Sequence, residues 1–369
     1  EVIVVSGGAA GMMAAIAAAD CGHQVTIIEK NEKLGKKLFI TGKGRCNITN
    51  DSDVENHLNH VISNPKFMYS AFYSFDSSRM IDFLEQEGLA VKTERGNRVF
   101  PQSDKSSDVL QTLQKALRRR NVTVRLHTKM TGLMIEDHIC KGVKVQSYHG
   151  ALETLTADDV ILTTGGLAYP STGSTGDGHR LLKQAGVALE PCYPALVPVE
   201  TVEEWPIRLQ GLSLRNVSLR VERGSHKIYE EQGEMLFTHF GVSGPLVLSA
   251  SSLLGRKGAK DCKLHIDLKP ALSEEQLDER LQRDFAAQKN SMFKNSLGKL
   301  LPSKLIPVIV ELSEITPDKQ VNEVTRQERH RLVKLCKDLT CTVKKLRDFP
   351  EAIVTGGGIS VKAINPATM

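Results

Sequence analysis

Residues 2–11 read Val-Ile-Val-Val-Ser-Gly-Gly-Ala-Ala-Gly, an apolar run followed by a glycine-rich turn and the start of an alanine-rich segment. This order predicts a buried strand, a tight turn and a helix whose first backbone N–H groups face outward. Such N–H groups, together with the helix dipole, favour a bound phosphate. The sequence therefore predicts the phosphate-binding turn of a dinucleotide fold.

A second strand and an acidic residue follow at the expected distance. Residues 24–28 read Gln-Val-Thr-Ile-Ile, and Glu29 comes eighteen residues after Gly11. A carboxylate at about this spacing accepts hydrogen bonds from ribose hydroxyls in dinucleotide folds. A glycine-rich turn without a ligand is the alternative, and the combination of strand, turn, helix, strand and acid argues against it.

Ser6 departs from the G-x-G-x-x-G pattern, in which the first position is glycine. A non-glycine residue held in a strained backbone region costs roughly 1–3 kcal/mol. Even micromolar binding amounts to about 8 kcal/mol. We therefore expect Ser6 to weaken nucleotide binding without abolishing it.

Composition is ordinary for a globular protein and excludes several classes. Of the 369 residues, 40% are hydrophobic and 25% are charged, and the formal net charge of +5 is small for this length. With 5% aromatic residues and no basic stretch interleaved with aromatics, nucleic-acid binding has little support. We expect no membrane span, because no apolar stretch has the length of one. The sequence gives no sign of a protein partner.

The seven cysteines are scattered and form no C-x-x-C pair. This distribution favours reduced thiols and a cytoplasmic location. His57 and His60 are the only closely spaced histidines, and we interpret them as a surface pair. No metal site is predicted.

The order of elements predicts an α/β fold with a Rossmann-like domain and a second, β-rich domain. Three short alternating runs at 132–137, 141–147 and 152–156 predict a three-stranded meander, inserted before a returning strand at 159–164. We expect the first domain to cover 1–195 and 350–369. The second should cover 196–349, with a helical insertion at about 271–345.

Four motifs together resemble the YhiN/BaiN-like family of NAD(P)/FAD-dependent flavoprotein oxidoreductases, whose members include an aminoacetone oxidase and a bile-acid intermediate reductase. The resemblance covers nearly the whole chain. The motifs are Ser6–Gly11, Leu34–Leu38 with Thr41–Asn50 (Thr-Gly-Lys-Gly-Arg-Cys-Asn-Ile-Thr-Asn), Thr164–Gly166 with Tyr169–Gly178, and Leu236–Pro245.

The resemblance implies bound FAD and assigns residues to it. The turn would meet the diphosphate, Glu29 the adenosine ribose, and the segment around Arg45 the flavin side, where a fixed positive charge tunes the ring. Basic residues that merely solvate a loop are the alternative for Arg45. The predicted cofactor-binding residues are Gly7, Gly8, Ala10, Gly11, Glu29, Lys30, Gly44, Arg45, Asn47, Met130, Thr164, Gly165, Gly166, Gly357 and Gly358.

The implied function is an FAD-dependent oxidoreductase acting on a small molecule, with NADH or NADPH as electron donor. We favour reduction of an activated C=C bond, such as that of an unsaturated 3-oxo bile-acid intermediate. The alternatives are an aminoacetone-type amine oxidase, a single-site NAD dehydrogenase and a non-catalytic flavin-binding protein. Tyr169 and His239 are candidates for substrate contact, and Asp177 is expected to cap the helix 177–185.

Both ends of the sequence lie inside expected structure. Glu1 already lies inside the first expected strand, and Met369 ends a loop-like segment, so we expect flanking residues beyond both. Members of the family continue past the position of Asn365-Pro366 into a further strand and a glycine-rich segment that closes over the flavin. Ala363 stands where the resemblance leads us to expect an acidic residue.

Overall fold

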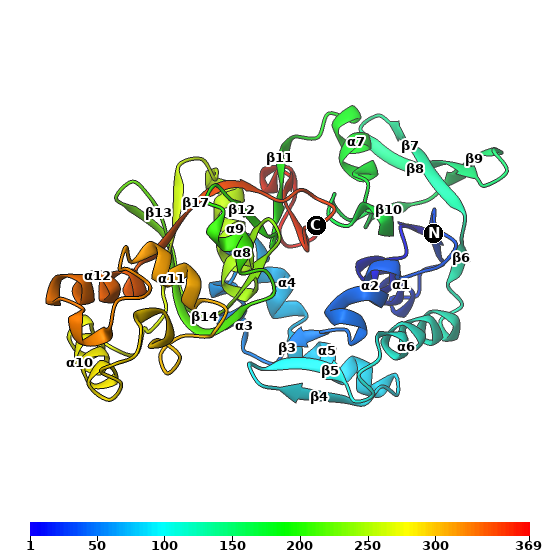
Figure 1. Cartoon of the computed structure of the whole chain (residues 1–369). Coiled ribbons are helices and arrows are strands. Elements are labelled where there is room, and N and C mark those ends of the chain that lie inside the picture. Colours follow the sequence, from blue (N-terminus) through cyan, green and yellow to red (C-terminus); the bar gives the residue numbers. More distant parts are fainter. The chain divides into compact units, whose positions relative to one another are not determined.

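The computed structural model describes all residues, Glu1–Met369, and the chain divides into two compact units. The first unit comprises residues 1–192 and 357–369, and the second comprises residues 193–356 (Figure 1). The boundaries expected from the sequence were 195/196 and 349/350. None of the helices is both long enough and apolar enough to cross a membrane.

A four-stranded parallel sheet forms the centre of the first unit. Its order is β10-β1-β2-β6, with bounds Asp159–Leu162, Val2–Val5, Val25–Ile28 and Thr123–Arg125. Strands that are covered on both faces are apolar throughout, as in residues 2–5. This sheet confirms the Rossmann-like core predicted from the sequence.

The two faces of the sheet are covered by different layers. Val2 and Val4 pack in one core with α1 (Ala9–Asp20) and α6 (Ser106–Arg119). Ile3 and Val5 alternate with them and pack in another core with the meander. The predicted meander is confirmed, and its strands are β7 (Thr128–Glu136), β8 (Ile139–Ser147) and β9 (Leu152–Thr156).

The segment between β2 and α6 contains more regular structure than the sequence predicted. Residues 31–50 lack clear periodicity, yet they include a short helix that follows Gly35, whose φ is +67°. A small sheet of order β3-β5-β4 lies in the same region. The elements are α2 (Lys36–Ile40), η1 (Thr41–Gly44), β3 (Thr49–Asn50), α3 (Val54–Asn59), η2 (Pro65–Met68), α4 (Tyr69–Ser74), α5 (Ser77–Gln86), β4 (Val91–Glu94) and β5 (Arg98–Pro101).

After β10 the chain makes a glycine-rich loop and then a short amphipathic helix. The remaining elements of this part are η3 (Pro170–Thr172), α7 (Asp177–Gln184), β11 (Leu189–Ala195), β18 (Val354–Ile359) and η6 (Val361–Ala363). Strands β11 and β18 form a two-stranded sheet at the points where the chain leaves the first unit and returns to it. Leu196 follows β11 with φ of +52°, so the chain turns before the next strand begins at Val199.

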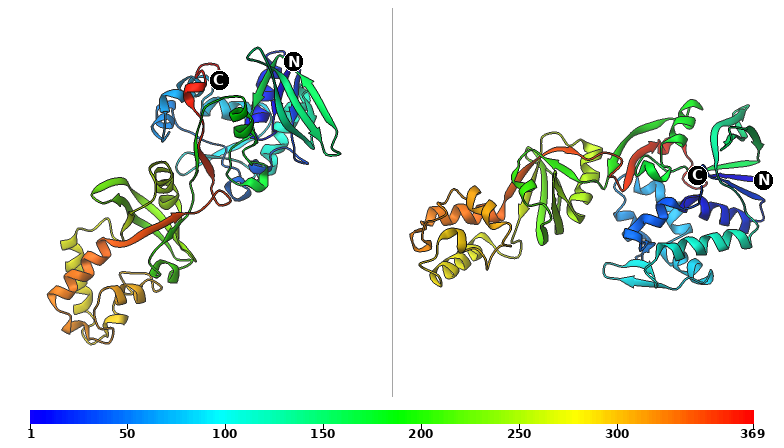
Figure 2. Two further views of the ribbon diagram at one scale, coloured as in Figure 1. Left: turned by 90° about the horizontal axis from the view of Figure 1, so that it is seen from above. Right: turned by 45° about the vertical axis from the view of Figure 1, so that its right-hand side comes forward.

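The second unit is built on a closed barrel of order β12-β15-β14-β13-β16-β17. Its core is continuous with that of the helical insertion, which Figure 2 shows in yellow to orange at one end of the barrel. The elements are β12 (Val199–Thr201), α8 (Trp205–Arg208), β13 (Ser213–Arg223), β14 (His226–Thr238), β15 (Gly241–Ser243), α9 (Pro245–Lys257), β16 (Cys262–Asp267), α10 (Glu274–Ala286), η4 (Phe293–Asn295), α11 (Ile306–Leu312), η5 (Val321–Glu323), α12 (Arg326–Lys337) and β17 (Leu339–Leu346).

Two elements of this unit differ from the sequence prediction. Helix α9 was not expected, because its small and apolar residues give no clear polar stripe, although Pro245 occupies a position that suits a helix start. The helical insertion ends at Lys337 rather than near 345. Leu339, Cys341 and Val343 are buried at every second position, which is the period of a strand.

Candidate functional site

The turn after β1 leaves the start of α1 open. Gly8 precedes the helix with no side chain capping it, the first turn holds no acidic residue, and Ala9 and Ala10 are exposed. A Cβ atom added to Gly8 would meet nothing within 4 Å. The first N–H groups of α1 are therefore accessible to an anion, which the helix dipole also favours.

Two other glycines of the turn are required by close packing. A Cβ atom on Gly7 would lie 2.1 Å from Leu34 Cδ2, and one on Gly11 would lie 1.9 Å from the backbone oxygen of Ser6. Gly11 thus lets α1 approach β1 closely. The glycine pattern has two physical causes, with open space at Gly8 and contact at Gly7 and Gly11.

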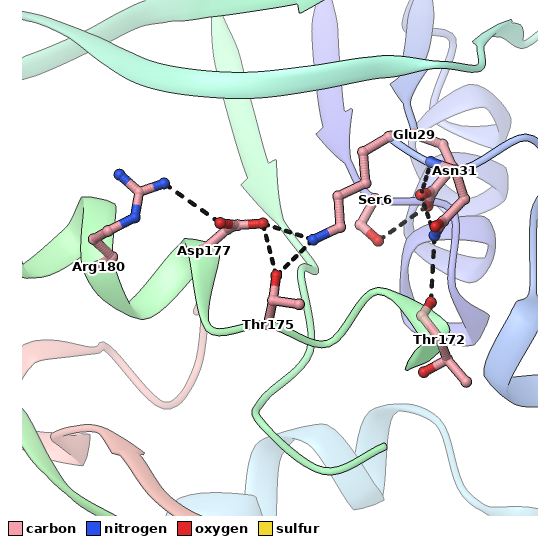
Figure 3. A network of polar contacts seen from close by, with 8 residues as sticks. Ser6, Glu29, Asn31, Thr172, Thr175, Asp177 and Arg180 are labelled. Carbon is pink, nitrogen blue, oxygen red and sulfur yellow. Dashed lines mark hydrogen bonds and ion pairs between the residues drawn. The ribbon is translucent and has the colours of Figure 1, made fainter. Parts of the chain in front are cut away.

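Glu29 follows β2 and points back at the turn, as Figure 3 shows. Its carboxylate is buried and accepts four hydrogen bonds, from Gly7 N at 2.7 Å, Asn31 N and Asn31 Nδ2 at 2.8 Å each, and Ser6 Oγ at 3.2 Å. A carboxylate has about four lone-pair positions. A ribose hydroxyl bound here would therefore take the place of a side-chain donor, either Ser6 Oγ or Asn31 Nδ2.

Ser6 adopts the backbone conformation that its position in the turn demands. Its φ is +84°, in the left-handed region that favours glycine. Thr163 Oγ1 donates to the carbonyl oxygens of Val5 at 2.8 Å and Ser6 at 2.9 Å. The residue is held by these contacts in a conformation that is costly for a side chain with a Cβ atom.

A small cavity, open to solvent, adjoins the turn. Its walls come from the ends of β1 and β2, the start of β7 and the loop after β10. Four residues predicted to bind the cofactor line it, namely Glu29, Lys30, Met130 and Thr164. The structure thus brings four of the fifteen residues predicted to bind the cofactor together at one cavity.

An ion pair closes one side of this cavity. Lys30 Nζ lies 2.6 Å from Asp177 Oδ2 and 2.7 Å from Thr175 Oγ1 (Figure 3). Burial alone would raise the pKa of Asp177, but the hydrogen bond and charge of Lys30 outweigh it and lower that pKa to about 2. The capping role expected for Asp177 is wrong, because Gly176 is the N-cap of α7 and the carboxylate is turned to Lys30.

The glycine-rich loop after β10 is packed on the segment after β2. Asn31 Nδ2 donates to Thr172 O at 3.3 Å, and a Cβ atom on Gly173 would lie 2.7 Å from Asn31 Nδ2. Gly165 has φ of +69°, and Gly166 O accepts a hydrogen bond from Gly176 N at 3.2 Å. The sequence analysis did not select Asn31 as a site residue. Its position shortly after the end of β2 could have indicated it, because polar residues at strand ends often contribute to such sites.

Arg45 is engaged by carboxylates of its own unit. Its guanidinium lies 2.6 Å from Glu94 and 2.5 Å from Asp104, and it stacks over Phe100 at 4.1 Å. Hydrogen bonds to the two carboxylates raise the pKa of Arg45. Its predicted place beside the flavin, with exposed Asn47 and with Gly44, stays a prediction.

The remaining candidates lie in different parts of the chain. Gly357 and Gly358 have φ of +79° and +117°, and Cβ atoms there would lie 2.1 Å from Pro191 O and 3.2 Å from His179 Nε2. Tyr169 is exposed in the first unit, whereas His239 is exposed in the second, where its ring contacts Phe240. No group of three or more metal-ligating side chains is present.

The sequence profile of the family described as "HI0933-like protein Rossmann domain" matches residues 1–369. A 3-dehydro-bile acid delta(4,6)-reductase of Clostridium scindens is 30% identical over 99% of this chain and 88% of its own length. A ribosomal RNA dihydrouridine synthase of Escherichia coli is 28% identical over 100% and 88%. A solved 3-ketosteroid-delta4-(5alpha)-dehydrogenase of Rhodococcus jostii is 14% identical, covering 97% of this chain and 84% of that one with a TM-score of 0.42.

Proposed function

Because this chain belongs to the HI0933-like Rossmann family, a family of FAD-dependent oxidoreductases, we propose that it reduces a carbon–carbon double bond conjugated to a carbonyl group. The single observation that carries the proposal is the 30% identity to a delta(4,6)-reductase over 99% of the chain. The cavity beside Glu29 and the open start of α1 support the FAD that this reaction needs.

The residues of the first unit fit the nucleotide half of FAD. The N–H groups of Ala9 and Ala10 beside Gly8 are free for a diphosphate, and Glu29 is the acceptor for the ribose. Met130 offers an apolar wall of the cavity for the adenine ring. FAD, when bound, supplies the hydride chemistry, while the protein binds and orients the reactants.

The names of two relatives support the type of bond. A delta(4,6)-reductase and a dihydrouridine synthase, as named, both add hydrogen across a carbon–carbon double bond. We propose an unsaturated 3-oxo steroid acid as substrate and NADH or NADPH as electron donor. We also propose a reducing cytoplasm as the location, supported by seven free thiols.

Reduction of uridine in ribosomal RNA is the second candidate. It is favoured by the 28% identity over the full chain to a protein named for that activity. A net charge of +5, with 48 basic against 43 acidic residues, argues against a large phosphate-binding surface. We therefore propose a small-molecule substrate and no nucleic-acid partner.

The test begins with the absorption spectrum of the purified protein, which should contain flavin bands. Anaerobic addition of NADH or NADPH should bleach those bands, and an unsaturated 3-oxo bile acid should restore them. If undermodified ribosomal RNA restored the flavin bands and the bile acid did not, the second candidate would be supported. If aminoacetone bleached the flavin bands and only oxygen restored them, the protein would be an amine oxidase. A protein that cannot be loaded with FAD would overturn the proposal.

A further inference from the structure

Two lysines tie the segment after β2 to the loop after β10. Lys30 Nζ donates to Asp177 at 2.6 Å, and Lys37 Nζ donates to the carbonyl oxygen of Ala168 at 2.7 Å. Both side chains therefore join the same two segments of the first unit. They differ in what neutralises their charge.

The charge of Lys30 is balanced by Asp177, whereas Lys37 has only a carbonyl oxygen as its protein acceptor. An ammonium group has three N–H donors, so two of those on Lys37 are left without a protein acceptor. The side chain is partly buried, and burial lowers the pKa of Lys37. A partly buried cation without a counter-charge is costly, and an anion placed beside it removes that cost.

Neighbouring lysines do not share this feature. Lys36 lies 3.4 Å from Glu32 in an exposed pair, and the Lys33 ammonium lies over the ring of Phe39. Lys37 is thus distinguished from the adjacent residue by its surroundings and not by its charge. This difference makes Lys36 a matched control.

Both segments that Lys37 joins are anchored on the phosphate-binding turn. Gly35 N donates to Gly7 O at 2.9 Å, two residues before Lys37. Thr163 Oγ1 donates to Ser6 O at 2.9 Å, five residues before Ala168. The ammonium is therefore held by segments that start at the turn whose N–H groups are open to an anion.

We propose that Lys37 is a binding residue for the diphosphate of a dinucleotide, supplying the positive charge that the neutral turn lacks. This proposal rests on the proposed function, because it takes the anion to be the FAD diphosphate. A dinucleotide diphosphate carries two negative charges. The N–H groups of α1 meet one side of it, and the Lys37 ammonium neutralises part of its charge.

The test measures binding of ADP to the full chain freed of flavin, by calorimetry, and then binding of FAD. ADP contains the adenosine and the diphosphate but no flavin ring. Lys37→Met should lower the affinities for ADP and for FAD by the same factor, about tenfold or more, because a charge-assisted hydrogen bond is lost. Lys36→Met should leave both affinities unchanged, and Lys37→Arg should retain most of the wild-type affinity.

Several results would overturn the assignment. An unchanged ADP affinity in Lys37→Met, with FAD alone weakened, would place the ammonium at the flavin ring. Equal losses of ADP affinity in Lys36→Met and Lys37→Met would mean that only the net charge of the protein matters. If Lys37→Arg bound ADP as weakly as Lys37→Met, the positive charge would not be the cause. If the wild-type protein bound ADP and FAD but reduced no double bond, the proposed function would be wrong and the role of Lys37 in binding the diphosphate would stand.

Discussion

The backbone N–H of Gly7 donates to Glu29 Oε2 at 2.7 Å, so the strand-end carboxylate is bonded to the glycine-rich turn itself. This contact joins two residues that lie 22 positions apart. It also orients the carboxylate before any nucleotide arrives, because Asn31 holds the other oxygen. Glu29 therefore stabilises the turn, and under the proposed function it would also bind the ribose.

Glu29→Gln should lower stability as well as nucleotide affinity. One carboxylate oxygen becomes an NH₂ group, which then faces the N–H donors of Gly7 or Asn31 without an acceptor. An unsatisfied buried donor costs about 1–3 kcal/mol. Urea denaturation of the flavin-free protein should report this loss, while Glu32→Gln, at an exposed residue of the same segment, should unfold like the wild type.

Ser6→Gly should have a larger free energy of unfolding than the wild type, because φ of Ser6 is already +84° without a nucleotide and the strain therefore acts on stability. Glycine adopts φ of +84° without strain, which is worth about 1 kcal/mol, and only a weak 3.2 Å hydrogen bond to Glu29 is lost. Ser6→Ala separates the two effects, because it keeps the strain and removes the hydroxyl. Urea denaturation of all three flavin-free proteins checks the order, and equal free energies of unfolding would show that Ser6 carries no penalty.

The sequence predicted the strand, turn, helix and carboxylate of the candidate nucleotide site because their signals are local. The strand, turn, helix and carboxylate between Val2 and Glu29 each follow from residue type and spacing. The Lys30–Asp177 pair could not be predicted, since the two residues are 147 positions apart and meet only after the sheet has formed. Strand β17 was missed for a similar reason, because its pattern is short and follows three helices.

The Lys30–Asp177 pair should make stability depend on pH in the acid range. The pKa of Asp177 is about 2 in the folded protein and 3.8 as its ordinary value, so the contribution is complete above pH 3.8 and is lost as the pH falls through 2. It amounts to at most about 2 kcal/mol at neutral pH, since solvent screens part of it. About half should be gone at roughly pH 3.

Asp177→Asn is the measurement for this pair. Urea denaturation at about pH 6 should show the variant to be less stable, and the gap should narrow at about pH 3. The effect should be absent in Asp348→Asn, an exposed acid of the second unit. A gap of the same size at both pH values would mean that the pair stabilises the fold by packing and not by charge.

Gly8→Ala and Gly11→Ala should separate nucleotide binding from folding within one turn. Gly8 has φ of −73°, and an added Cβ atom meets nothing within 4 Å, so the free energy of unfolding without ligand should stay within about 0.5 kcal/mol of the wild type. The methyl group nevertheless occupies space at the open start of α1, where a diphosphate needs close contact with the N–H groups. FAD affinity should therefore fall in Gly8→Ala, by titration of the flavin-free protein.

Gly11→Ala should instead lose stability even in the absence of FAD. Its Cβ atom would lie 1.9 Å from Ser6 O and 2.7 Å from Thr163 Oγ1, so α1 must move away from β1. Overpacking of this kind costs about 1–3 kcal/mol, and urea denaturation should detect it before any ligand is added. If Gly8→Ala instead lost stability and kept its FAD affinity, the open start of α1 would not be the diphosphate site, and the assignment of the cavity would be wrong.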